Sequence, residues 1–142
     1  MITTVLADDP GLAGLATAFA TALTGRAPDE VRQPWEAGAP GAVRPDVVVA
    51  ASRADAGRPT AHVHPDLSGA LAFALVVGGA GSTGGWPLVA ALVAAGARCP
   101  APVLHVAGPP QDPAAAIACY CRYWRPAVTA LVAAGRDRRP AA

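Results

Sequence analysis

The chain has 142 residues, the usual length of one domain, and its 53% hydrophobic and 15% charged residues exclude a disordered chain. Its formal net charge is +1, so no overall field favours nucleic acid or an anionic membrane surface as a partner. Gly and Pro interrupt the apolar stretches well before about 20 residues, so we expect no membrane span.

Hydrophobic periodicity and turn residues predict five strands and three helices that alternate along the chain. In chain order they are a strand from Ile2 to Ala7, a helix from Leu12 to Leu23, a short strand from Glu30 to Trp35, a strand from Asp46 to Ala51, a strand from Leu71 to Val77, a helix from Trp86 to a stop at Gly96, a strand from Val103 to Val106, and a helix from Ala114 to about Ala134. This order indicates a mostly parallel sheet with helices on both faces, and five strands suit a flavodoxin-like three-layer α/β sandwich of strand order 2-1-3-4-5. We expect one domain over residues 1–135 and a flexible basic tail over residues 136–142.

Several single residues refine this prediction. Gly25 can cap the first helix, and Asp112 can cap the last helix with Pro113 at its first position. Pro126 should kink or break that last helix. The polar stretch from Ser52 to Pro65 should be a loop.

A glycine-rich run, Gly78–Gly85, follows the fourth strand and precedes a helix. Glycine lets backbone N–H groups approach a ligand closely, and a helix N-terminus attracts negative charge. The run allows three interpretations: a dinucleotide fingerprint, a turn without a ligand, or a loop that contacts a flavin ring. The dinucleotide mode needs an acidic residue at the end of the next strand, where Ala107-Gly108-Pro109-Pro110 stands instead.

Four segments carry a resemblance that spans most of the chain. They are Leu67–Gly79, with a Leu-x-Gly start and a Gly-Gly end; Pro87–Pro100, a helix followed by Gly-Ala; Asp112–Ala115 with the closing helix; and Asp46–Ser52, an apolar strand with an acidic start. Together they resemble the NADPH-dependent FMN reductase family of flavodoxin-like proteins. The resemblance implies an oxidoreductase that acts on a small molecule or a flavin, with FMN as cofactor and NADPH as a hydride donor.

The loop after the first strand departs from that family. The family binds the FMN phosphate there with a Gly-Ser/Asn-Pro-Arg/Lys loop followed by Ser-x-Thr, whereas this chain reads Ala7-Asp8-Asp9-Pro10-Gly11. No Ser, Thr, Arg or Lys stands between Ala7 and Ala16 to offset the two carboxylates. After the third strand the family lines its flavin with an aromatic residue, but here Ser52-Arg53 follows without one. The resemblance therefore implies an FMN reductase relative with an impaired phosphate site.

We expect the loops Asp8–Gly11, Ser52–Pro59 and Gly78–Gly85 to form a cleft at the C-terminal ends of strands one, three and four. The residues expected to contact a cofactor there are Pro10, Gly11, Ser52, Arg53, Gly78, Gly79, Gly81, Ser82, Thr83 and Gly84. A flavin-free relative is the second hypothesis, either as a binding or partner subunit or as a cofactor-independent enzyme. In that enzyme Asp8 and Asp9 would be the catalytic acid and base, although a solvated turn that caps the first helix explains them as well.

The remaining features concern metals, thiols and assembly. His62 and His64 lie two apart in an extended segment, but loop histidines are usually solvated, so we expect no metal site. The three cysteines are an odd number and no basic segment precedes the first apolar run, so we expect reduced thiols in the cytoplasm. Cys119 and Cys121 lie two apart on a helix and should not pair.

An aromatic cluster on the last helix predicts a homodimer. Tyr120, Tyr123 and Trp124 have the i, i+3, i+4 spacing that places residues on one helix face. Aromatic residues are enriched at interface centres, and a small sheet does not cover so much aromatic area. We expect a two-fold dimer that buries this face.

Overall fold

The structure is a computed structural model that describes residues 1–7, 9–32, 44–53, 67–78, 85–107 and 112–138. Its elements are β1 (Thr3–Ala7), the 3₁₀ turn η1 (Pro10–Leu12), α1 (Ala13–Thr24), β2 (Glu30–Arg32), β3 (Val47–Arg53), β4 (Leu71–Val77), α2 (Gly85–Ala94), β5 (Leu104–Val106) and α3 (Pro113–Arg138). The five strands form one sheet of order β2-β1-β3-β4-β5, and all neighbouring pairs are parallel. The predicted flavodoxin-like class and strand order are confirmed.

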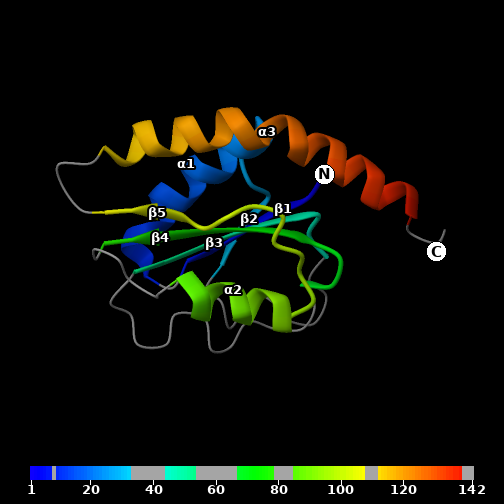
Figure 1. The fold of residues 1–142 in the computed structure, drawn as a ribbon, viewed down its shortest axis with the longest axis horizontal. Coiled ribbons are helices and arrows are strands. Elements are labelled where there is room, and N and C mark those ends of the chain that lie inside the picture. The colour runs from blue at the N-terminus through cyan, green and yellow to red at the C-terminus, as the bar shows by residue number, and fades with distance from the viewer. Residues whose placement is uncertain (8, 33–43, 54–66, 79–84, 108–111, 139–142) are drawn as a thin grey trace.

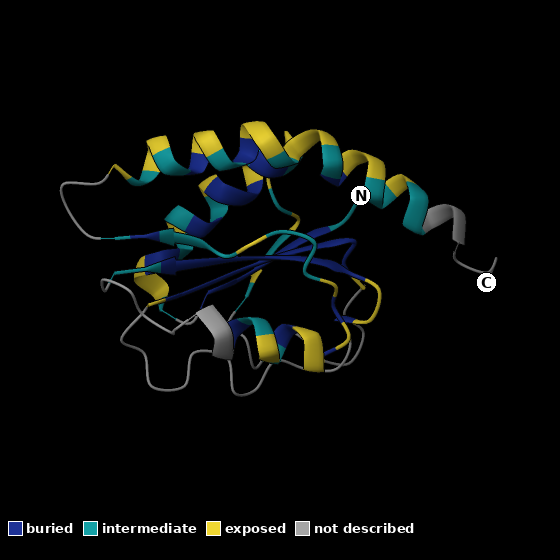
Figure 2. Cartoon of the chain, in the orientation of Figure 1, coloured by how far each residue is buried: buried dark blue, intermediate teal, exposed yellow. Residues whose placement is uncertain are grey.

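The sheet lies between two helical layers. Helices α1 and α3 cover one face, and α2 covers the other (Figure 1). Successive side chains of each strand point to opposite faces of the sheet and therefore pack in two separate hydrophobic cores. Phe19 of α1 and Phe73 of β4 belong to the first core, whereas Leu88 and Leu92 of α2 pack on the second. Figure 2 shows the three central strands, β1, β3 and β4, buried almost throughout and the helices with one exposed side.

Helix ends follow the predicted capping chemistry. Gly25 ends α1 with a φ of 83°, a left-handed conformation in which glycine carries no Cβ penalty. At the start of α3, the carboxylate of Asp112 accepts a hydrogen bond from the Ala114 N–H at 3.0 Å. Both predicted caps are confirmed.

Helix α3 was expected to kink or break at Pro126. The helix continues through this proline to Arg138, so it does not break there, and Figure 1 shows the helix bending part-way along. Proline removes the hydrogen bond to the carbonyl four residues earlier, which belongs to Arg122. Both residues are exposed, so water can solvate that carbonyl and the helix can continue.

The third strand also differs from its predicted end. Ser52 and Arg53 were expected to begin a loop, but β3 extends through both because they pair with Val76 and Val77 of β4. The parallel ladder therefore delivers Arg53 to the C-terminal edge of the sheet. No helix in the described part of the chain is long and apolar enough to cross a membrane.

Candidate functional site

The candidate site lies at the C-terminal edge of the sheet, where open parallel sheets bind their ligands. Strands β1, β3 and β4 lie side by side and end there at Ala7, Arg53 and Val77. The segment that follows β1 turns at once into η1 and then into α1. This edge is the place that the sequence predicted for a ligand cleft.

An ion pair joins the segment after β1 to the end of β3. Nε of Arg53 donates to Oδ2 of Asp9, 44 positions earlier in the chain. The other carboxylate oxygen, Oδ1, accepts the backbone N–H of Gly11 at 2.8 Å. The carboxylate of Asp9 is thus held by a side chain from the next strand and by an amide of its own turn.

The position of Gly11 explains why the turn tolerates this packing. A Cβ at Gly11 would lie 3.2 Å from Nη2 of Arg53 and 3.2 Å from Oδ1 of Asp9. The guanidinium therefore rests directly against the glycine backbone. Any larger residue at Gly11 would force the Arg53 side chain to shift.

The ion pair also sets the protonation state of Asp9. The hydrogen bond from Arg53, followed by that from the Gly11 N–H, lowers the pKa of this carboxyl below its usual value of 3.8. Asp9 is consequently ionised at neutral pH and is a weak base. A general base works best with a pKa near the operating pH, so the predicted acid–base role of Asp9 is not favoured by its surroundings.

Ser52, a predicted cofactor contact, is buried within β3. Its exposed fraction is 1%, and its hydroxyl donates to the Arg53 carbonyl at 3.3 Å. In this position the hydroxyl serves the chain itself. Of the two predicted contacts from β3, only Arg53 therefore presents its side chain at the edge.

The ends of β4 and β5 contribute a residue that the sequence reasoning missed. Gly78 follows β4 with a φ of 89°, and its N–H donates to the Val106 carbonyl at 2.8 Å. Its own carbonyl lies 2.8 Å from Nε2 of His105. A histidine inside an otherwise apolar final strand was the available signal, because that strand ends at the same edge of the sheet.

Several predicted residues lie outside the described part of the chain. These are Asp8, Gly79, Gly81, Ser82, Thr83, Gly84, His62 and His64. Their predicted roles in catalysis, cofactor contact or solvation stay predictions. Among the described residues, no group of three or more His, Cys, Asp or Glu side chains could hold a metal ion.

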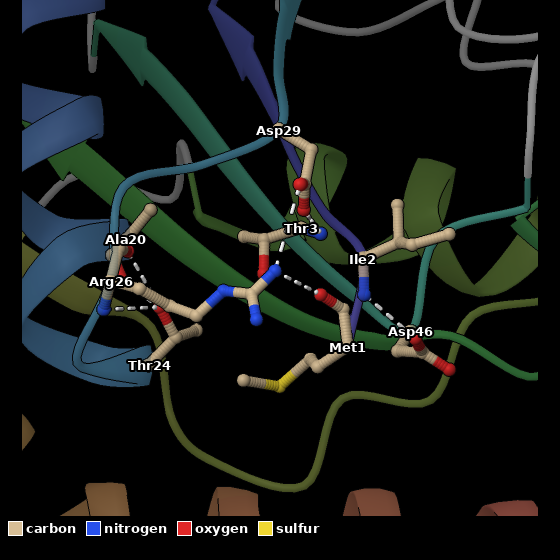
Figure 3. Close-up of polar contacts among 8 residues, drawn as sticks. All are labelled: Met1, Ile2, Thr3, Ala20, Thr24, Arg26, Asp29 and Asp46. Carbon is tan, nitrogen blue, oxygen red and sulfur yellow. Dashed lines mark hydrogen bonds and ion pairs between the residues drawn. The ribbon is translucent and has the colours of Figure 1, made fainter.

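At the N-terminal end of β1, two carboxylates also accept backbone N–H groups, and there they hold the strand in place (Figure 3). The carboxylate of Asp46 accepts the Ile2 N–H at 2.8 Å, and that of Asp29 accepts the Thr3 N–H at 2.8 Å. The guanidinium of Arg26 lies 3.6 Å from Asp29. These contacts tie the start of β1 to the segments that precede β2 and β3.

The aromatic residues of α3 do not form one exposed face, so that part of the dimer argument is wrong. The ring of Tyr120 packs 5.4 Å from that of Phe19, and its hydroxyl donates to the Pro102 carbonyl at 2.7 Å. Trp124 also packs against the core, whereas Tyr123 is 76% exposed. The side of α3 that carries Tyr120 and Trp124 faces α1, because Ile117, Cys121 and Val128 on that side are buried in the core that α1 shares.

The cysteines are free, as the helical spacing predicted for Cys119 and Cys121. Cys119 is exposed and Cys121 is buried, so the two thiols lie on different sides of α3. Burial raises the pKa of the Cys121 thiol to about 11. A thiol with so high a pKa is a poor nucleophile at neutral pH, and it is part of the core.

Comparison with known proteins supports the fold. No family model matches the chain, and no curated protein matches it in sequence. Among solved structures, that of oxidised flavodoxin 1 from Bacillus cereus superimposes with a TM-score of 0.51 at 12% sequence identity, covering 98% of this chain and 99% of that one. An identity this low establishes the fold alone, so the chain has a flavodoxin-like fold, and its resemblance to the FMN reductases remains a resemblance.

Proposed function

We propose that this chain is a flavin-linked oxidoreductase that binds its small-molecule ligand at the C-terminal edge of β1, β3 and β4. One observation carries the proposal: the Asp9–Arg53 ion pair joins the segment after β1 to the end of β3, where Arg53 pairs with Val77, next to the turn at Gly78. The likeness to an oxidised flavodoxin over nearly the whole chain supports a flavin as the ligand. NADPH as hydride donor follows only from the sequence resemblance.

The two parts of FMN fit this edge differently. A flavin ring, when bound, supplies hydride and electron transfer, and Gly78 begins the glycine-rich run that would contact it. The phosphate does not fit the segment after β1, because the carboxylate of Asp9 already holds the Gly11 amide there. We therefore assign no catalytic step to FMN.

A flavin-free binding or partner subunit is the second candidate, and the same Asp9 contact favours it. The cofactor-independent enzyme is the weaker form of this candidate, because the lowered pKa of Asp9 makes its carboxylate a poor base.

Flavin binding tests the proposal directly. Purified protein should quench the fluorescence of added flavin or shift its visible absorbance, and NADPH should bleach the bound flavin. Absence of binding for both riboflavin and FMN at high concentration would reject the oxidoreductase and leave the flavin-free subunit.

We keep a homodimer as part of the proposal, with Tyr123 as the aromatic residue available to a partner. Tyr123→Ala should weaken the dimer, whereas Arg122→Ala on the same helix serves as the control. Light scattering at micromolar concentration measures the assembly. A mass near the chain's 14.1 kDa for the unaltered protein would reject the dimer.

A further inference from the structure

We infer that the ligand of this edge is a flavin that carries no phosphate, because Asp9 fills the place where this fold would receive one. That the ligand is a flavin rests on the proposed function, whereas the exclusion of a phosphate rests on the contacts of Asp9 alone. In the flavodoxin-like strand order, ligands bind at the C-terminal ends of β1 and β3, where the strand order reverses, and an anion there would meet the amides that begin α1.

Those amides already have acceptors from the chain itself. The Gly11 N–H donates to the Asp9 carboxylate at 2.8 Å, and the Leu12 N–H donates to the Asp9 carbonyl at 2.9 Å. The Ala13 N–H donates to the Pro10 carbonyl. Three consecutive donors at the entrance to α1 are therefore used before any ligand arrives.

A cation beside this turn is engaged as well. Arg53 is the cation that the ladder places beside this turn, and its Nε donates to Asp9. Its Nη2 would lie 3.2 Å from a Cβ at Gly11, so the guanidinium also takes up the space over the turn. A phosphate would have to displace the Asp9 carboxylate to reach the Gly11 amide or Nε of Arg53.

The negative charge of Asp9 opposes phosphate binding more than the strength of the Asp9–Arg53 ion pair does. Side chains of Asp9 and Arg53 are 39% and 45% exposed, and exposed ion pairs break at little cost. Breaking the pair would still leave an ionised carboxylate within reach of the phosphate, since the two share one turn. An ionised carboxylate on the same turn still repels the phosphate after the pair has broken, so a phosphate-free flavin is preferred.

The test compares riboflavin with FMN on the full-length protein and on two variants. The unaltered protein should bind riboflavin about tenfold more tightly than FMN, a preference that Asp9→Asn should abolish by removing the charge. Asp9→Gly, which also removes the acceptor, should favour FMN. Asp29→Asn is the matched control, because Asp29 likewise holds one backbone N–H and lies near one arginine, at the opposite end of β1. It should leave the preference unchanged.

A second readout decides the inference even when no flavin binds. The Gly11 amide resonance is followed by NMR while inorganic phosphate is added at constant ionic strength. It should stay unmoved in the unaltered protein and shift in Asp9→Gly. In the unaltered protein, a preference for FMN or a phosphate-dependent shift of the Gly11 resonance would overturn the inference. It would also be overturned if Asp9→Gly showed neither a preference for FMN nor a phosphate-dependent shift. Absence of flavin binding with the expected phosphate result would reject the proposed function alone.

Discussion

The two ends of β1 use one chemical device, a carboxylate that accepts a backbone N–H, in opposite surroundings. At the N-terminal end, Asp46 is 6% exposed and accepts from a residue 44 positions away. At the C-terminal end, Asp9 is exposed and accepts from a residue two positions away. A buried, long-range bond holds strands in register, whereas an exposed, local bond shapes a turn. The first end should therefore govern stability, and the second should govern which ligand enters.

Removing Asp46 should have the largest effect on folding. Asp46→Ala leaves the part-buried Ile2 N–H without its acceptor, which costs about 1–3 kcal/mol of the free energy of unfolding. Asp46→Asn should recover part of the loss because its amide oxygen can accept the same hydrogen bond. Urea unfolding followed by circular dichroism measures both, with Asp9→Ala as the comparison. Equal losses for Asp46→Ala and Asp9→Ala would break the proposed division between the two ends.

Backbone conformation should contribute more stability at the C-terminal edge than the carboxylate does. Gly78→Ala should cost about 1–2 kcal/mol, because its φ of 89° strains any residue with a Cβ, even though no described residue lies within 4 Å of where that Cβ would be. Gly14→Ala is the control, since Gly14 lies in α1, no described residue lies within 4 Å of a Cβ there, and an alanine should stabilise the helix. Thermal unfolding of the two variants gives the comparison. A neutral Gly78→Ala would show that this turn relaxes without cost.

The order of the elements could be predicted because each signal is local. Apolar runs identify β3 and β4, and Gly25 and Asp112 mark helix ends through their own backbone or side chain. The face of α3 that packs inward could not be predicted, because helical spacing groups residues without saying which group meets the sheet. Tyr120 and Tyr123 show this, since one is held by Phe19 and the other is exposed.

The candidate site was predicted as a place but not as a set of contacts. The loop that carries Asp9 contains no cation of its own, and the cation that offsets this carboxylate is Arg53 on the neighbouring strand. The predicted strand order already placed β1 beside β3, but the end of β3 was predicted too early by two residues. Pairing with β4 extends the strand, and a pairing of this kind is a tertiary effect that local sequence does not encode.

The smallest expected effect is the loss, at acid pH, of the stability that Asp9 contributes. The hydrogen bonds from Arg53 and Gly11 lower the pKa of Asp9 in the folded chain, so the ionised carboxylate favours the folded state above the unfolded pKa of about 3.8. That contribution is lost as the pH falls through the lowered folded pKa. The melting temperature of Asp9→Asn should therefore lie slightly below that of the unaltered protein at pH 6, and the gap should close toward pH 3. The gap should be smaller than the Gly78→Ala effect because the pair is exposed. A gap that stays constant from pH 6 to pH 3 would show that Asp9 stabilises the turn as a hydrogen-bond acceptor and not through its charge. Asp9 and Asp46 would then differ only in how far they are buried.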